Sequence, residues 1–91
     1  MKKQHLDEKI IDAISFIQRS PDREKVLKDL KNDLKIPTRI SNSTGISTSN
    51  VSRALQKLKE KNLVICLNEK ANQGRLYQIT DFGLEVLKFV K

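Results

Sequence analysis

The spacing of the apolar residues changes at Asn62, and this change limits the fold more than any other feature of the sequence. Before Asn62, apolar residues recur at the three- and four-residue intervals of amphipathic helices. After it, residues 63–67 form a short, continuous apolar run that is typical of a buried strand. A return strand is predicted from Leu76, Tyr77, Ile79 and Thr80, after a polar stretch containing Asn72 and Gly74. Residues 63–80 are therefore predicted to form a β-hairpin with a long tip. The chain is therefore predicted to be mainly α-helical with one small β-hairpin.

Turn-forming and capping residues divide the first part of the chain into helices. The apolar spacing predicts a first helix over about 5–18. Ser20 suits the N-cap of a second helix and Pro21 its first position. The apolar stripe of that helix includes Leu34, and Pro37 is expected to stop it.

The next segment is predicted to form two helices joined by a tight turn. Thr38 is expected to cap a short helix that runs through Ser43, with Gly45 ending it in a left-handed conformation. Ser47 or Thr48 then caps a longer helix with an apolar inner face. Asn62 is expected to end this longer helix because asparagine tolerates a positive φ.

Positive charge is concentrated in one window. The chain of 91 residues has a formal net charge of +7, and residues 38–62 contribute most of that excess, with Glu60 as their only acid. Residues 38–52 are also rich in serine, threonine and asparagine. Although a charged run is often only a solvated surface, cations and short hydrogen-bonding side chains without acids suit a polyanion, so this window is predicted to bind one.

Composition excludes several other classes. The longest apolar run, Leu63–Leu67, is too short to span a bilayer, and the amino end does not resemble a signal peptide. Cys66, the single cysteine, cannot form an internal disulfide, which favours a cytoplasmic location. With one histidine and one cysteine there are too few ligands for a zinc site and no nucleophile–base pair, so no metal, no cofactor and no enzymatic activity is expected.

Two segments carry a resemblance to a known family. The segment PTRISNSTGISTSNVSRALQKLKEKNLV (residues 37–64) resembles the DNA-binding core of MarR-like and related winged-helix transcriptional regulators. The segment GRLYQITDFGLEVL (residues 74–87) resembles the wing exit and following helix of the same proteins. The sequence departs from the family at Ser41, where alanine is usual, and at Asn62, where glycine is usual. The resemblance implies a winged helix-turn-helix fold and a sequence-specific, double-stranded DNA-binding transcriptional regulator.

The resemblance assigns the helix at about 47–61 to the major groove and the wing at about 68–75 to the minor groove or backbone. Arg53 would reach a guanine edge or a phosphate, Asn50 an adenine, and Lys57 a phosphate. For Ser47 and Thr48 the alternative is capping alone, and for the wing an ordinary charged loop. The complete set of expected DNA-binding residues is Thr38, Arg39, Ser47, Thr48, Ser49, Asn50, Ser52, Arg53, Lys57, Lys70, Gln73 and Arg75.

Both ends of the chain carry more apolar surface than a single winged helix needs. Residues 1–19 are expected to be a dimerisation helix, and residues 20–91 a DNA-binding domain with a C-terminal helix that begins at Thr80–Asp81. Alternatively, the two terminal helices pack on each other within one chain. A homodimer would hold two recognition helices about one DNA turn apart, ~34 Å. The side chains expected at its interface are Leu6, Ile10, Ile14, Ile17, Leu84, Leu87 and Val90.

Two other functions fit the same fold. One is a protein-interaction module that docks on a partner in a larger assembly. The other is an architectural DNA-binding protein without sequence preference. Neither the operator nor an effector ligand follows from the sequence.

Overall fold

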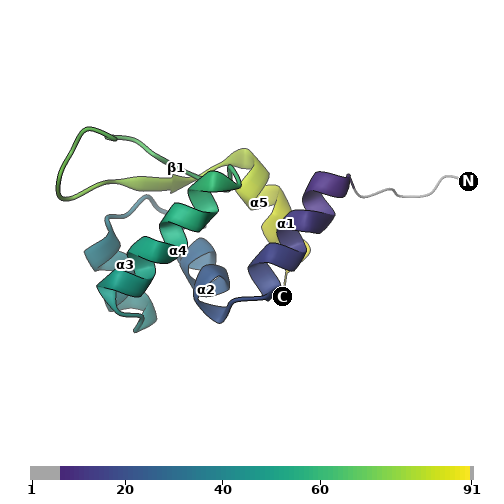
Figure 1. The fold of residues 1–91 in the computed structure, drawn as a ribbon, viewed down its shortest axis with the longest axis horizontal. Helices are drawn as coiled ribbons and strands as arrows, with labels where there is room; N and C mark the ends of the chain where they lie inside the picture. The colour runs from purple at the N-terminus through teal and green to yellow at the C-terminus, as the bar shows by residue number, and fades with distance from the viewer. Residues whose placement is uncertain (1–6, 91) are drawn as a thin grey trace, which may run out of the picture.

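The computed structural model describes residues 7–90, in which a two-stranded hairpin runs along one edge of the group of helices (Figure 1). The elements are α1 (Glu8–Gln18), α2 (Pro21–Asp29), α3 (Pro37–Thr44), α4 (Thr48–Glu60), β1 (Val64–Cys66), β2 (Tyr77–Ile79) and α5 (Asp81–Leu87). The strands are antiparallel, with Ile65 opposite Gln78. The predicted fold class, mainly helical with a small hairpin, is confirmed.

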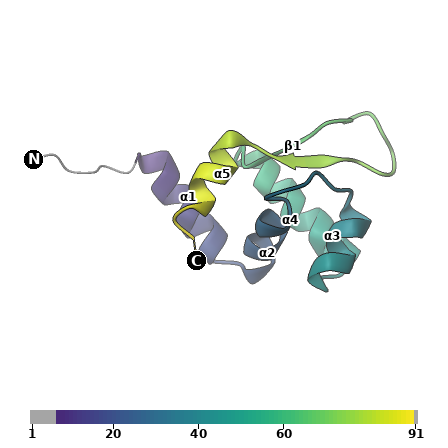
Figure 2. The same ribbon diagram turned by 180° about the vertical axis from the view of Figure 1, so that it is seen from behind.

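The arrangement in space separates the two ends of the molecule. Helices α1 and α5 lie side by side at one end (Figures 1 and 2). Helix α3 lies at the other end, and the loop between β1 and β2 extends toward it. We call this loop, residues 67–76, the wing. It therefore stands next to the α3–α4 pair rather than next to the terminal helices.

One core unites the helices with the sheet. The apolar face predicted for the longer helix is confirmed, because Val51, Ala54, Leu55 and Leu58 are buried. Each large side chain so buried contributes about 1.5–3 kcal/mol. The fully buried side chains come from every helix and from the sheet: Ile17, Leu27, Leu30, Ile40, Leu55, Leu58, Leu63, Val26, Val51, Val64 and Val86.

Most predicted helix ends are confirmed. The hydroxyl of Ser20 accepts a hydrogen bond from the backbone N–H of Arg23, and Pro21 begins α2. Gly45 ends α3 with φ +79°, and Asn62 follows α4 with φ +61°. The first helix starts later than predicted, because Asp7 is its N-cap and has an extended ψ of 142°. Residues before Asp7, including Leu6, lie outside the described part of the chain.

Two boundaries were predicted wrongly. Helix α2 ends at Asp29, not before Pro37, and Leu34 is 38% exposed instead of lying on its buried stripe. The chain leaves the helix because the backbone of Lys35 pairs with that of Tyr77. The N–H of Lys35 donates to the carbonyl of Tyr77 at 3.1 Å, and the N–H of Tyr77 donates to the carbonyl of Lys35 at 2.9 Å. Thr38 is not the cap of α3 either; that helix begins one residue earlier, at Pro37, and its N-cap Ile36 makes no side-chain cap bond.

Gly83 allows α5 to approach the base of the hairpin very closely. A Cβ at this position would meet the carbonyl oxygen of Leu63 and lie 2.6 Å from Cγ1 of Ile79. Just before it, Thr80 caps α5, because its hydroxyl accepts from the N–H of Gly83 at 2.9 Å. The same hydroxyl faces the carbonyl oxygens of Asn62 at 2.8 Å and Leu63 at 3.1 Å. The end of α4, the hairpin and the start of α5 therefore meet at one point.

Candidate nucleic-acid interface

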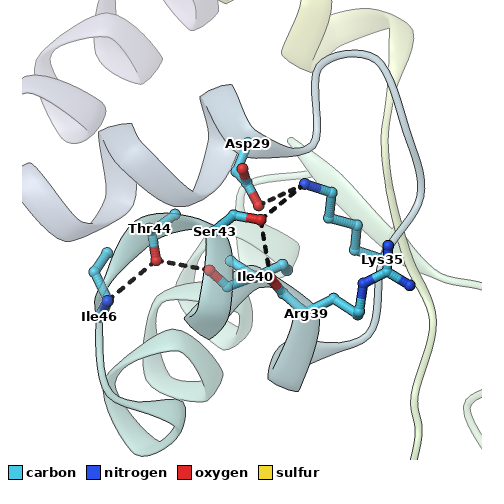
Figure 3. Close-up of polar contacts among 7 residues, drawn as sticks. All are labelled: Asp29, Lys35, Arg39, Ile40, Ser43, Thr44 and Ile46. Carbon is cyan, nitrogen blue, oxygen red and sulfur yellow. Dashed lines mark hydrogen bonds and ion pairs between the residues drawn. The ribbon is translucent and has the colours of Figure 1, made fainter.

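The turn between α3 and α4 is fixed by hydroxyl groups from the polar window. The hydroxyl of Ser41 donates to the carbonyl of Ile46 at 2.6 Å. That of Thr44 donates to the carbonyl of Ile40 at 2.7 Å and accepts from the N–H of Ile46 at 3.2 Å (Figure 3). These side chains hold the angle between the helices, so part of the serine- and threonine-rich composition has a structural cause.

Lys35 holds α3 against α2. Its ammonium group contacts the carboxylate of Asp29 and the hydroxyl of Ser43, which in turn donates to the carbonyl of Arg39 at 3.0 Å (Figure 3). Sequence reasoning did not single out Lys35, because its partners lie on two different helices.

The first half of α4 presents polar side chains to solvent. Ser47, and not Thr48, is the N-cap of α4, because the hydroxyl of Ser47 accepts a hydrogen bond from the backbone N–H of Asn50 at 3.2 Å. The other polar side chains between Thr48 and Lys57 make no hydrogen bond or ion pair with residues 7–90, and all of them are exposed: Thr48, Ser49, Asn50, Ser52, Arg53, Gln56 and Lys57. Nothing in the described chain competes with a ligand for them.

The wing is held by its own polar groups. The side-chain oxygen of Asn68 accepts from the N–H of Leu76 at 2.7 Å, and its amide nitrogen donates to the carbonyl of Gly74 at 3.2 Å. Arg75 is half-buried and donates from Nε to the carbonyl of Ala71 at 2.9 Å, which fixes its guanidinium on the wing. Lys70 is exposed. The wing is thus an ordered loop that carries cations.

Glu69 is the only acid of the wing, and its charge is balanced. A carboxylate oxygen lies 2.7 Å from the ammonium of Lys59 on α4. The hydrogen bond that the ammonium of Lys59 donates to the carboxylate of Glu69 raises the pKa of Lys59 above its ordinary value. Lys59 is therefore engaged with the wing, whereas Arg39, Arg53, Lys57 and Lys70 have no carboxylate partner among residues 7–90.

A groove of about 410 Å³ lies between the wing and helices α3 and α4. It brings together predicted residues from three segments, namely Thr38, Thr48, Ser52, Gln73 and Arg75. It is also lined by Gln56 and Asn72, which sequence reasoning missed. The sequence could have indicated Gln56, because it is a polar residue one helical turn beyond Ser52.

A smaller hollow of about 170 Å³ lies on the other side of α4, against the start of α2. It is lined by Asn50, Arg53 and Lys57 from α4 and by Ser20, Asp22 and Arg23 from α2. Arg23 is held there by a 2.9 Å hydrogen bond to the carbonyl of Phe16 and by stacking 4.0 Å from the centre of that ring. Most predicted residues of α4 thus divide between two sides of the helix. The predicted DNA-binding residues that line neither hollow are Arg39, Ser47, Ser49 and Lys70.

The structure places most of the predicted interface residues within the chain's own core. Ile10, Leu87 and Val90 are each 8% exposed and Ile17 is fully buried, while Ile14 packs against the core and Leu84 remains exposed. This matches the alternative in which the terminal helices pack on each other. The apolar side chains that these helices leave exposed are Ile11, Leu84 and Phe89, at 49%, 36% and 44%.

The helix-turn-helix followed by a wing agrees with the comparisons with known proteins. The family model described as winged helix-turn-helix matches residues 24–91. The chain belongs to the winged helix-turn-helix family. Among curated proteins, none matches the sequence of this winged helix protein.

Solved structures share the winged helix fold at low sequence identity. TubR from Bacillus thuringiensis serovar israelensis, bound to 24 bp of tubC, has a TM-score of 0.75 at 14% identity, covering 96% of this chain and 95% of TubR. The homodimeric DNA-binding domain of Mb0332 from Mycobacterium bovis, a possible ArsR-family regulator, has a TM-score of 0.67 at 20% identity. The match covers 96% of this chain and 82% of the Mb0332 domain. ZitR from Lactococcus lactis has a TM-score of 0.67 at 24% identity. The match covers 77% of this chain and 49% of ZitR, so the chain spans about half of ZitR's length.

Residues 7–90 of this winged helix domain contain neither a membrane-spanning helix nor a metal-binding cluster of histidine, cysteine and acidic side chains. No helix in that range combines the length and the apolar character needed to cross a bilayer. The same range contains no cluster of three or more histidine, cysteine or acidic side chains arranged to bind a metal.

Proposed function

We propose that this winged helix protein is a sequence-specific, double-stranded DNA-binding transcriptional regulator. Helix α4 enters the major groove, and the wing contacts the minor groove or backbone. The observation that carries the proposal is the first half of α4, whose polar side chains are exposed and have no partner among residues 7–90, beside a groove that a cationic wing also lines. Short polar side chains at this end of a recognition helix are suited to base edges.

The charge distribution supports a nucleic acid over a protein partner. Helices α3 and α4 contain no acid before Glu60, and the acid of the wing is paired with Lys59. Arg39, Arg53, Lys57 and Lys70 remain free to approach phosphates. A surface of this kind gains affinity from released counterions.

The solved structures support the same function by analogy. TubR is bound to DNA in its structure, and Mb0332 is described as a DNA-binding domain. The finer assignment to MarR-like regulators rests on the sequence resemblance. We place the action of the protein in a reducing cytoplasm, where Cys66 would remain the free, buried thiol that the structure shows.

A homodimer completes the proposal. One helix-turn-helix covers only a few base pairs, and a twofold dimer presents two recognition helices to half-sites ~34 Å apart. Mb0332 is homodimeric. Because most of the predicted interface residues lie in the core, we assign the dimer contact to the exposed apolar side chains at the two ends of the chain, Ile11, Leu84 and Phe89.

Selection of binding sites from random duplexes with the purified chain tests this function. A regulator should enrich one motif with two similar half-sites. Retention of all duplexes with similar affinity would instead identify an architectural protein. Failure to retain any duplex at low salt would point to the protein-interaction alternative.

A further inference from the structure

We infer that the two sides of α4 have separate tasks on DNA: the side toward the wing reads bases, and the side toward α2 holds the phosphate backbone. The wing-side row is Thr48, Ser52 and Gln56, and the α2-side row is Asn50, Arg53 and Lys57. This inference rests on the proposed function, since it assumes that α4 lies on DNA.

The two rows are separated by the geometry of the helix. Residues four apart lie on the same side of a helix, which aligns Thr48 with Ser52 and Gln56, and Arg53 with Lys57. The first row lines the groove of about 410 Å³ under the wing. The second lines the hollow of about 170 Å³ beside the start of α2. No residue of α4 lines both.

The rows also differ in charge. The wing-side row contains hydroxyl and amide groups only, whereas the α2-side row has two cations in a hollow that Arg23 shares. Asp22 lines that hollow too, but it forms no ion pair with Arg53 or Lys57 among the described residues. Cations therefore outnumber acids there, which suits a phosphate.

The width of the major groove explains why the charged row and the uncharged row of α4 would contact different parts of DNA. A helix with its side chains is about 10–12 Å across, and the groove is about 12 Å wide. The flank of the helix that carries long cations therefore lies near one phosphate row. On the opposite flank, Arg75 of the wing lines the groove and supplies the positive charge, so the uncharged row is left to face base edges.

Gln56 is the side chain of the wing-side row best suited to specify a base. A glutamine can bond both N6 and N7 of adenine, which a serine or threonine hydroxyl cannot do alone. Gln56 is exposed and has no partner among residues 7–90. Arg53 is then a backbone contact, not a reader of guanine.

The test compares Gln56→Ala with Arg53→Gln, two exposed positions on the same helix. Affinity is measured by fluorescence anisotropy on the selected duplex and on a scrambled duplex, each at several salt concentrations, with circular dichroism confirming that both variants fold. Gln56→Ala should reduce the preference for the selected duplex about tenfold or more without changing the salt slope. Arg53→Gln should weaken binding to both duplexes equally and lower the salt slope by about 1 for each bound protomer.

Each outcome is decisive. If Arg53→Gln removes the preference while Gln56→Ala leaves it intact, the assignment of the rows is overturned and the proposed function stands. If the unaltered protein binds neither duplex, or both equally, the proposed function fails and the inference falls with it. Ser52→Ala is a second test of the wing-side row and should lower the preference in the same direction as Gln56→Ala.

Discussion

The ammonium of Lys35 lies 3.0 Å from Oδ2 of Asp29, and both side chains are 16% exposed. The same ammonium lies 3.2 Å from the hydroxyl of Ser43, while the backbone of Lys35 pairs with Tyr77 of β2. One residue thereby ties α2, α3 and the hairpin together. The position of α3 under the wing depends on this connection.

Removing the partner of Lys35 should destabilise the fold. Asp29→Ala leaves a mostly buried ammonium with one hydroxyl partner, and we expect a loss of about 1–3 kcal/mol in the free energy of unfolding. Glu69→Ala is the matched control, because it removes an ion pair in which Glu69 is 52% exposed, worth about 0.2–1 kcal/mol. Urea unfolding measures both. Equal losses would show that the Lys35 contact contributes nothing beyond a surface ion pair.

The hydroxyl of Thr80 should matter more than its methyl group. Thr80→Val removes the cap of α5 and the contact with the end of α4, at a cost of about 1–2 kcal/mol. Thr80→Ser keeps the hydroxyl and should cost less than half as much. In a domain of this size, thermal unfolding should show a shift of about 4–8 °C for each kcal/mol. If Thr80→Ser is as unstable as Thr80→Val, packing of the methyl group is the main contribution.

Salt should weaken DNA binding strongly. A dimer that neutralises about 6–10 phosphates loses about 10³–10⁵ in affinity between 50 and 200 mM salt. Anisotropy titrations on the selected duplex across this range check the expectation. A nearly flat response would remove DNA as the main partner.

Neighbouring positions of α1 separate a dimer interface from the core. Ile11 is 49% exposed and Ile10 is 8% exposed. Ile11→Glu combined with Phe89→Glu should therefore give a folded monomer that loses specific DNA binding. Ile10→Glu should instead unfold the chain, because it places a charge in the core.

Sedimentation at micromolar concentration and circular dichroism distinguish these outcomes. If the unaltered chain runs as one 10.5 kDa species and still binds a single half-site tightly, no dimer is involved. The exposed side chains of the terminal helices would then have another purpose.

Local chemistry predicted most of the fold. Ser20, Gly45 and Asn62 mark helix ends through their own backbone and side-chain preferences, and the structure confirms all of these positions. The end of α2 was wrong because Leu34 continues a helical spacing, whereas the backbone pairing that interrupts it joins Lys35 to Tyr77. A contact between residues so distant leaves no local pattern.

The same limit applies to the candidate site. The polar row at the start of α4 was visible in the composition, and the structure shows it to be exposed. That Gln56 and Asn72 line one groove was not visible, because the groove forms only when the wing lies beside α4. The sequence offered only the polar character of Gln56, one turn beyond Ser52. The pairing of Glu69 with Lys59 has the same origin.

The absence of a side chain at Gly83 has a mechanical consequence. Helix α5 rests on the backbone of Leu63 and on Ile79 with no intervening side-chain layer, and closely packed interiors transmit displacement instead of absorbing it. A tilt of α5 would therefore move the base of the hairpin that carries the wing. A displacement of the terminal helices, at the end of the molecule farthest from α3, should therefore also displace the wing beside α3.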